Sequence, residues 1–169
     1  MSKILPEKIA SIAESFVGRM ESPIGSNKGP QIQEFFSADS YDPNGEKPGD
    51  DGYAWCASFV CRVIQLAMAG RDWTFTRPTT PGAWDFERWS LDQDDSTWTL
   101  KPCGDNIQRG DIVIFRRSHI GIAVSSPNSK GRVSTVEGNT NNEGEREGIA
   151  VMRKTRSTSA FRSRIRFTV

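Results

Sequence analysis

A single cysteine stands where this sequence could supply a nucleophile. Cys56 follows Trp55 in the stretch AWCASFVCRV and precedes apolar residues at helical spacing, so we expect it in the first turn of a helix. The unpaired N–H groups at a helix start favour negative charge, and the thiolate is the reactive form of a cysteine side chain. Cys56 is therefore the candidate nucleophile, whereas Cys61, inside the same helix, suits a buried structural role.

A thiol nucleophile needs a base, and the chain has a single histidine, His119. It begins the run HIGIAVSS, which we expect to pair with RVSTVEGNT in a hairpin centred on Ser129. In such a hairpin the residue numbers of two facing positions add up to 258, so His119 lies opposite Asn139. Glu137 projects from the same face and lies diagonally within reach of the imidazole. Either side chain could orient the ring, and a register slip of one residue would turn both away.

The elements that must position these residues change in period along the chain. Apolar spacing predicts helices over about 6–17, 30–36, 56–69 and, more briefly, within 81–91. Five β-branched and aromatic runs then predict strands at 111–115, 119–126, 132–140, 149–155 and 163–169. Helices followed by strands indicate an α+β fold, with N-terminal helices packed on a C-terminal antiparallel sheet of about five strands. Without repeats or a linker, residues 1–169 are expected to form a single domain.

The order and spacing of these features resemble a known family. A cysteine that opens a long helix, a histidine on a later strand preceded by RGDIVIF, and Glu-x-Asn on the next strand are similar to the pattern of the CHAP amidases and related papain-like peptidoglycan hydrolases. The resemblance covers about residues 52–140, roughly half of the chain. It implies a papain-like hydrolase domain in which the cysteine attacks an amide of the wall peptide. The histidine is then the base, and the acid and the amide orient it.

Carried over to this chain, the implied catalytic residues are Cys56, His119, Glu137 and Asn139. Two features depart from the family pattern. Ser118 occupies a position where many members have glycine, and the tryptophan-rich segment 71–109 matches no part of the pattern. The role of that segment in substrate specificity is left open.

Three aromatic residues are candidates for contact with the substrate. The backbone amide of Cys56 is the natural oxyanion donor, and the Tyr53 hydroxyl could add to it or could instead anchor its own loop. Trp55 and Trp84 could wall a groove for a glycan or a peptide stem, although tryptophans also serve as core residues.

The sequence supports neither a metal site nor a nucleic-acid partner. The acidic loop DPNGEKPGDDG (42–52) lacks the spacing of a calcium loop, and one histidine with three scattered cysteines gives no zinc motif. We therefore expect no metal and no other cofactor. Lys and Arg total 22 against 21 Asp and Glu, which gives no electrostatic case for nucleic acid or membrane. The charge is nevertheless uneven, because segment 85–95 carries five acids against one base. Cys61 and Cys103 could pair or stay free.

The last predicted strand alternates basic and apolar residues. Its two faces carry Arg162, Arg164 and Arg166 on one side and Ile165 and Phe167 on the other. This alternation is typical of a half-buried edge strand, and contact with anionic wall polymers or with an acidic partner protein is the alternative interpretation.

We predict a papain-like hydrolase that cleaves peptidoglycan stems or cross-bridges through a cysteine acyl-enzyme. The N-terminus lacks the uninterrupted apolar core of a secretory signal, and no run approaches the length of about 18 residues that a membrane span needs. We therefore expect a protein that is made in the cytoplasm, does not insert into a membrane, and is delivered to the periplasm or cell wall. We also expect it to be a monomer. It would then resemble a phage endolysin, or a type VI secretion effector that an immunity protein neutralises in the producing cell.

Two other functions stay open at this point. A cysteine protease or deamidase acting on a protein substrate would use the same machinery. A catalytically idle wall-binding domain would retain these polar residues without bringing them together. The sequence does not indicate which wall bond is cut.

Overall fold

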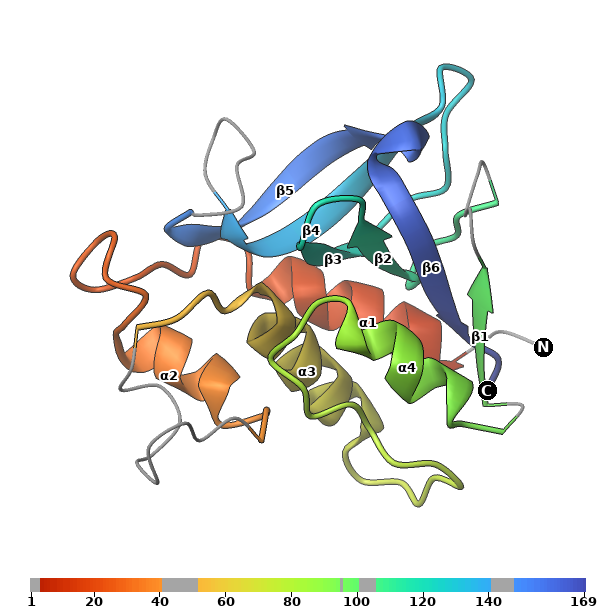
Figure 1. Cartoon of the computed structure of the whole chain (residues 1–169), viewed down its shortest axis with the longest axis horizontal. Helices are drawn as coiled ribbons and strands as arrows, with labels where there is room; N and C mark the ends of the chain where they lie inside the picture. Colours follow the sequence, from red (N-terminus) through yellow and green to blue (C-terminus); the bar gives the residue numbers. More distant parts are fainter. Residues whose placement is uncertain (1–3, 41–51, 95, 101–105, 141–147) are drawn as a thin grey trace.

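The computed structural model describes residues 4–40, 52–94, 96–100, 106–140 and 148–169. Within them lie four helices, α1 (Ile4–Ser15), α2 (Pro30–Phe36), α3 (Cys56–Met68) and α4 (Asp85–Leu91). The strands are β1 (Thr97–Leu100), β2 (Ile112–Phe115), β3 (Ile120–Ala123), β4 (Arg132–Thr140), β5 (Ala150–Ser157) and β6 (Phe161–Phe167), with a short 3-10 helix (Thr158–Ala160) before the last. The helices precede the strands, as predicted, and lie below the sheet in Figure 1. None of these helices combines the length and apolar character that a bilayer crossing requires.

The six strands form one antiparallel sheet in the order β1-β6-β2-β3-β4-β5. The strand that the sequence did not reveal is β1, which is only four residues long and therefore too short to show a clear alternation. Because β1 pairs with β6, the last strand is an inner strand, and its prediction as an edge strand is wrong. The edges of the sheet are β1 and β5.

The arginines of β6 are held by acidic side chains on neighbouring elements. Arg166 is 6% exposed, and its guanidinium donates two hydrogen bonds of 2.7 Å to the carboxylate of Asp111, just before β2. Arg162 ion-pairs with Glu87 of α4. Buried charges are tolerated when they are paired, so these contacts fix β6 within the sheet. Because Arg162 and Arg166 are paired in this way, β6 does not present the basic surface that contact with an anionic partner would need.

Helix α3 lies at the centre of the core. It packs on α1 and α2 and on strands β3 and β4. One face of the helix is fully buried, and it consists of Phe59, Val60, Val63, Ile64 and Ala67. Because this face is fixed against the sheet, the N-terminus of α3, and Cys56 with it, is held close to the hairpin of β3 and β4.

Gly138 allows β4 to approach α3 closely. A Cβ atom at this position would lie 2.7 Å from Cβ of Phe59 and 2.9 Å from Cζ3 of Trp55. Any side chain here would therefore push the strand away from the helix. The glycine of the Glu-Gly-Asn sequence thus brings Glu137 toward the start of α3.

Candidate active site

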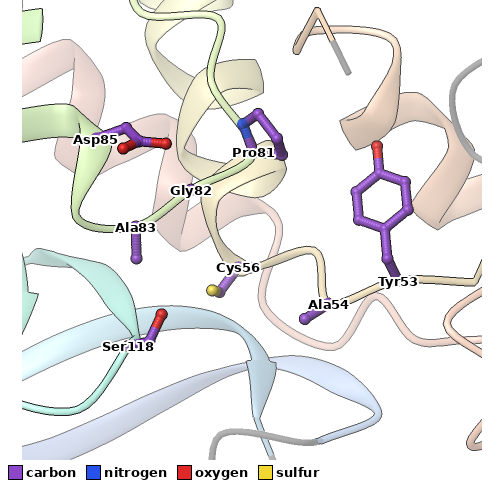
Figure 2. A pocket seen from close by; sticks show the side chains of 8 residues that line it. All are labelled: Tyr53, Ala54, Cys56, Pro81, Gly82, Ala83, Asp85 and Ser118. Carbon is purple, nitrogen blue, oxygen red and sulfur yellow. The ribbon is translucent and has the colours of Figure 1, made fainter. Parts of the chain in front are cut away.

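Cys56 is the first residue of α3, as the apolar spacing predicts. Trp55, the N-cap residue, makes no side-chain cap hydrogen bond to the helix, so its side chain does not occupy the N–H groups of the first turn. Cys56 is 5% exposed, and its sulfur faces the pocket drawn in Figure 2. A thiol with one open side and helix N–H groups behind it has the environment of a nucleophile.

His119 lies between β2 and β3 with its ring buried. The ring packs against that of Phe115 with 5.0 Å between centroids, and the His119 carbonyl accepts a 3.0 Å hydrogen bond from the Phe115 N–H. Nε2 lies 3.0 Å from Oε2 of Glu137. An ionised carboxylate only accepts hydrogen bonds, so we assign the proton in this contact to Nε2. Nδ1 is then the nitrogen that can exchange a proton with other groups.

The contact between His119 and Glu137 follows from the register of the hairpin. Ile122 pairs with Val136, and their sum of 258 is the register that the sequence predicts. In this register Gly121 faces Glu137, and a Cβ atom at Gly121 would lie 2.8 Å from Cγ of Glu137. The glycine leaves the space over β3 through which the glutamate reaches the imidazole.

Besides His119, two side chains hold the carboxylate of Glu137. Arg156 of β5 donates to it from Nε at 2.8 Å and from a terminal nitrogen at 2.5 Å, and the Thr135 hydroxyl donates at 2.5 Å. Burial by itself raises the pKa of Glu137, but the hydrogen bonds and charges of Arg156 and His119 lower it to about 2. Glu137 is therefore ionised at any physiological pH and accepts from the ring throughout.

His119 and Cys56 interact electrostatically. Burial lowers the pKa of His119, but the nearby sulfur of Cys56, and then the hydrogen bond and charge of Glu137, raise the pKa to about 9. Nδ1 is buried and makes no hydrogen bond of regular geometry within the described residues. The sulfur and the ring are thus close together but do not form a hydrogen bond of regular geometry. Such long or poorly aligned contacts are common in catalytic pairs before substrate binds. At neutral pH the raised pKa favours an imidazolium beside the sulfur.

A pocket of about 330 Å³ opens at Cys56. Its lining comes from the residues before α3, from the segment that leads into α4, and from the residue before His119: Tyr53, Ala54, Cys56, Pro81, Gly82, Ala83, Asp85 and Ser118. Figure 2 shows the hydroxyl of Ser118 pointing toward Cys56 from the opposite side. Part of the segment 71–109, which had no counterpart in the family pattern, therefore forms a wall of the site.

Asn139 does not take the place that the sequence indicates. Its Oδ1 accepts a hydrogen bond from the Gly148 N–H at 3.3 Å, and neither ring nitrogen of His119 bonds to it. The pairing of β4 with β5 shifts between Glu137 and Thr140, and Asn139 has a φ of 52°. This bulge changes the direction of the side chain, so the facing positions of an ideal hairpin do not apply there.

Tyr53 anchors its own loop, one of the two roles that the sequence left open. Its hydroxyl donates to the carboxylate of Asp39 at 3.4 Å, and its ring packs on Phe36 with centroids 4.4 Å apart. Figure 2 shows the hydroxyl directed away from Cys56. Tyr53 is nevertheless one of the residues that line the pocket.

The two tryptophans differ in their access to solvent. Trp55 is fully buried, stacks on Phe35 and donates from Nε1 to Glu21 at 2.9 Å, so its prediction as a substrate contact is wrong. A tryptophan ring in the core removes more apolar surface from water than the same ring in the wall of a groove, which favours the core position. Trp84 is 43% exposed, and its Nε1 donates to the Phe115 carbonyl at 3.2 Å. It sits between two pocket residues in the chain and stays a predicted substrate contact.

Two residues of the site were not found from the sequence. Thr135 lies two positions before Glu137 and so projects from the same face of β4, a spacing that could have revealed it. Arg156 comes from β5, where Arg153 and Lys154 carry the same charge. The sequence does not show which of these basic residues reaches Glu137, because that depends on how β5 pairs with β4.

The structure describes Cys61, whereas Cys103 and most of the acidic loop lie outside the described residues. Cys61 is a free, fully buried thiol that donates to the Thr80 carbonyl at 3.4 Å, and burial raises the pKa of that thiol. It does not pair with Cys103, which lies outside the described residues, as do 42–51 of the acidic loop. Among the described residues, no group of acids, cysteines and histidine could hold a metal ion.

Alkylation should separate the two described thiols. In a Cys103→Ser background, iodoacetamide at neutral pH should label Cys56 at least about tenfold faster than Cys61, because Cys56 opens on a pocket beside His119 and Cys61 is buried. The rates can be followed by mass spectrometry of digested peptides. His119→Ala should slow the labelling of Cys56. Equal rates at the two cysteines would favour the catalytically idle domain.

Comparison with known proteins identifies the family to which this fold belongs. Helices followed by an antiparallel sheet, with the cysteine at a helix start and the histidine just before a strand of the sheet, form a papain-like α+β fold. The family model of the CHAP domain matches residues 48–139, more than half of the chain, so the chain belongs to the CHAP domain family. The resemblance noted in the sequence is thereby confirmed.

One solved structure supports the same fold over nearly the whole chain. The crystal structure of a wild-type endolysin, LysIME-EF1, matches with a TM-score of 0.59 and 17% sequence identity over 95% of this chain. The matched part is 63% of that endolysin chain, so this chain spans less than two thirds of its length. No curated protein sequence matches the chain.

Proposed function

We propose that the protein is a cysteine hydrolase that cleaves an amide bond in the peptide stem or cross-bridge of peptidoglycan. The observation that carries this proposal is the arrangement of three side chains at an open pocket: Glu137 contacts His119, and His119 lies beside Cys56, which lines the pocket. Membership of the CHAP domain family and a fold shared with an endolysin support the cell wall as the substrate.

In the first half of the reaction, the Cys56 thiolate attacks the carbonyl carbon of the scissile amide and a C–S bond forms. The negative charge that develops on the carbonyl oxygen is stabilised by N–H groups at the start of α3, including that of Cys56. As the C–N bond breaks, His119 gives the proton on Nδ1 to the leaving nitrogen. The amine departs and a thioester remains.

In the second half, water loses a proton to Nδ1 of the now neutral His119 and attacks the thioester carbonyl. The C–S bond breaks, which releases the carboxylic acid and restores the thiolate and the imidazolium. One water is consumed for each amide cleaved. Glu137 keeps its contact with Nε2 in both halves, because Arg156 and Thr135 hold the carboxylate and keep it ionised. Asn139 stays a predicted member of the site.

Two biological settings fit this activity. In one, the protein is an endolysin that reaches the wall at lysis. In the other, it is a secreted antibacterial effector that acts as a monomer in the periplasm of a target cell and is neutralised in the producer by an immunity protein. Periplasmic expression in a susceptible cell should cause lysis in either setting, and protection by a neighbouring gene product is expected only for an effector.

Digestion of purified sacculi tests the proposed reaction. The wild-type protein should release fragments whose stem peptides carry new amino and carboxyl ends, detected by mass spectrometry. Each cut should add the mass of one water. Intact sacculi, together with a cleaved or deamidated protein in a mixed extract, would instead establish the protein-directed protease or deamidase.

A further inference from the structure

Among the described residues that line the pocket at Cys56, Asp85 is the only acidic or basic one. It is the first residue of α4, and the other wall residues contributed by its segment are Pro81, Gly82 and Ala83. Figure 2 shows its carboxylate directed toward Pro81 and Gly82, along the wall above the sulfur. A group that enters the pocket therefore meets a negative charge as well as the nucleophile.

No basic side chain in the described part of the chain neutralises the carboxylate of Asp85. The side chain is exposed and forms no ion pair within the described part of the chain. Its hydrogen bond comes from the Thr80 hydroxyl, at 3.2 Å from Oδ2. Glu87, two residues later, provides a contrast, because it is buried and ion-paired with Arg162. Of these two acids, only Asp85 offers its charge to a ligand.

The chain leaves room for this carboxylate at the pocket wall. A Cβ atom on Gly82 would lie 2.3 Å from Oδ2 of Asp85. Asp85 also lines a second hollow of about 310 Å³, which shares Pro81 with the first and adds Arg88 and Asp92. The two hollows meet at Asp85, and the acids of segment 85–95 outnumber its one base. A substrate that runs across both hollows therefore passes the carboxylate.

We infer that Asp85 is a specificity-determining residue that binds a protonated amine of the substrate beside the scissile amide. This inference rests on the proposed function and narrows its substrate class to peptides with a free ammonium group near the bond that is cut. In peptidoglycan that group has two sources, the side-chain amine of a diamino acid in a stem that is not cross-linked, and the N-terminal amine of a stem already freed from its glycan. An ammonium and a carboxylate form a charge-assisted hydrogen bond, which an acetylated amine cannot replace.

Four substrates prepared from the same stem peptide test this inference. The first is joined to its disaccharide, so that only the side-chain amine is free, and the second is the same molecule after acetylation. The third is the peptide without glycan and with its side-chain amine acetylated, so that only the N-terminal amine is free, and the fourth has both amines acetylated. We expect wild-type kcat/KM to be roughly tenfold higher for a free amine than for its acetylated partner in one of the two pairs, mainly through KM.

Asp85→Asn keeps an acceptor for the Thr80 hydroxyl and removes only the charge, so the ratio of free to acetylated substrate should fall to about one. Asp94→Asn removes the same charge from the same acidic segment but outside both hollows, and it should keep the wild-type ratio. Circular dichroism of each variant checks that the fold is retained.

The outcomes separate the inference from the proposed function. Equal wild-type rates within both pairs would overturn the role of Asp85 and leave the hydrolase intact. An equal fall of the ratio in Asp94→Asn would also overturn it, because net charge would then account for the effect. If the wild-type protein cleaves none of the four peptides and no sacculi, the proposed function fails, and the inference fails with it.

Discussion

Cys56→Ala should lower the rate of sacculus hydrolysis by at least about 10³-fold, to the background of the assay. The reaction loses the atom that forms the acyl-enzyme, and Cys56 is the only cysteine among the described residues that line the pocket. The release of soluble muropeptides per enzyme per minute measures the effect. The fold should be retained, because the substitution removes a single atom at the edge of the core, where Cys56 lines the pocket.

Cys61→Ala is the matched control for this substitution. It removes the same atom from the same helix, but Cys61 is fully buried and its thiol donates to the Thr80 carbonyl. We expect it to keep near wild-type hydrolysis and to lower the free energy of unfolding by about 1–2 kcal/mol, through a small cavity and a lost hydrogen bond. Urea denaturation measures this loss. Hydrolysis retained in Cys56→Ala, or lost in Cys61→Ala with the fold intact, would remove the assignment of the nucleophile.

The parts of the site that depend on regular elements could be predicted from the sequence. Apolar spacing was sufficient to place Cys56 at the start of α3, because a helix that packs on a sheet must show its buried face in the sequence. The hairpin register was sufficient to bring Glu137 to His119, because the turn length fixes which strand positions face one another. Both inferences concern short stretches whose geometry repeats from residue to residue.

The parts that depend on irregular geometry or on distant strands could not be predicted. Asn139 lies in a bulge of β4, where the alternation that the prediction used breaks down. Arg156 reaches Glu137 only because β5 pairs beside β4. Trp55 precedes the nucleophile in the chain yet faces the core, since a residue next to a catalytic one need not point the same way. The wall formed by 81–85 had no periodic pattern that could have indicated it.

Glu137→Gln should lower kcat by about 10²–10³-fold, with a smaller effect on KM. The carboxylate accepts from Nε2 of His119 and stabilises the positive imidazolium, whereas a neutral amide does so weakly and can present its NH₂ group to the ring. Arg156 and Thr135 would still find an acceptor in the glutamine, so the side chain should stay in place. Steady-state kinetics on a soluble stem peptide measures kcat and KM separately.

Asp111→Asn is the matched control, because Asp111 is another buried carboxylate that accepts two hydrogen bonds from an arginine, here Arg166. It lies before β2, whereas His119 follows that strand, so the variant should lose stability and keep the wild-type kcat per folded molecule. A similar loss of kcat in both variants would show that Glu137 acts on the fold rather than on His119.

The pH dependence gives the sharper test of Glu137. The imidazolium of His119 must be present to protonate the leaving nitrogen, so wild-type activity should fall as pH rises through the pKa of about 9. Glu137 is one of the two groups that raise this pKa, so Glu137→Gln should move the alkaline limb to lower pH. Stability should follow the same sign: protonation of His119 stabilises the folded state fully below its ordinary pKa of 6.5, and this contribution is lost as pH rises through about 9. An alkaline limb that stays in place in Glu137→Gln would show that the carboxylate does not act through the charge of the ring.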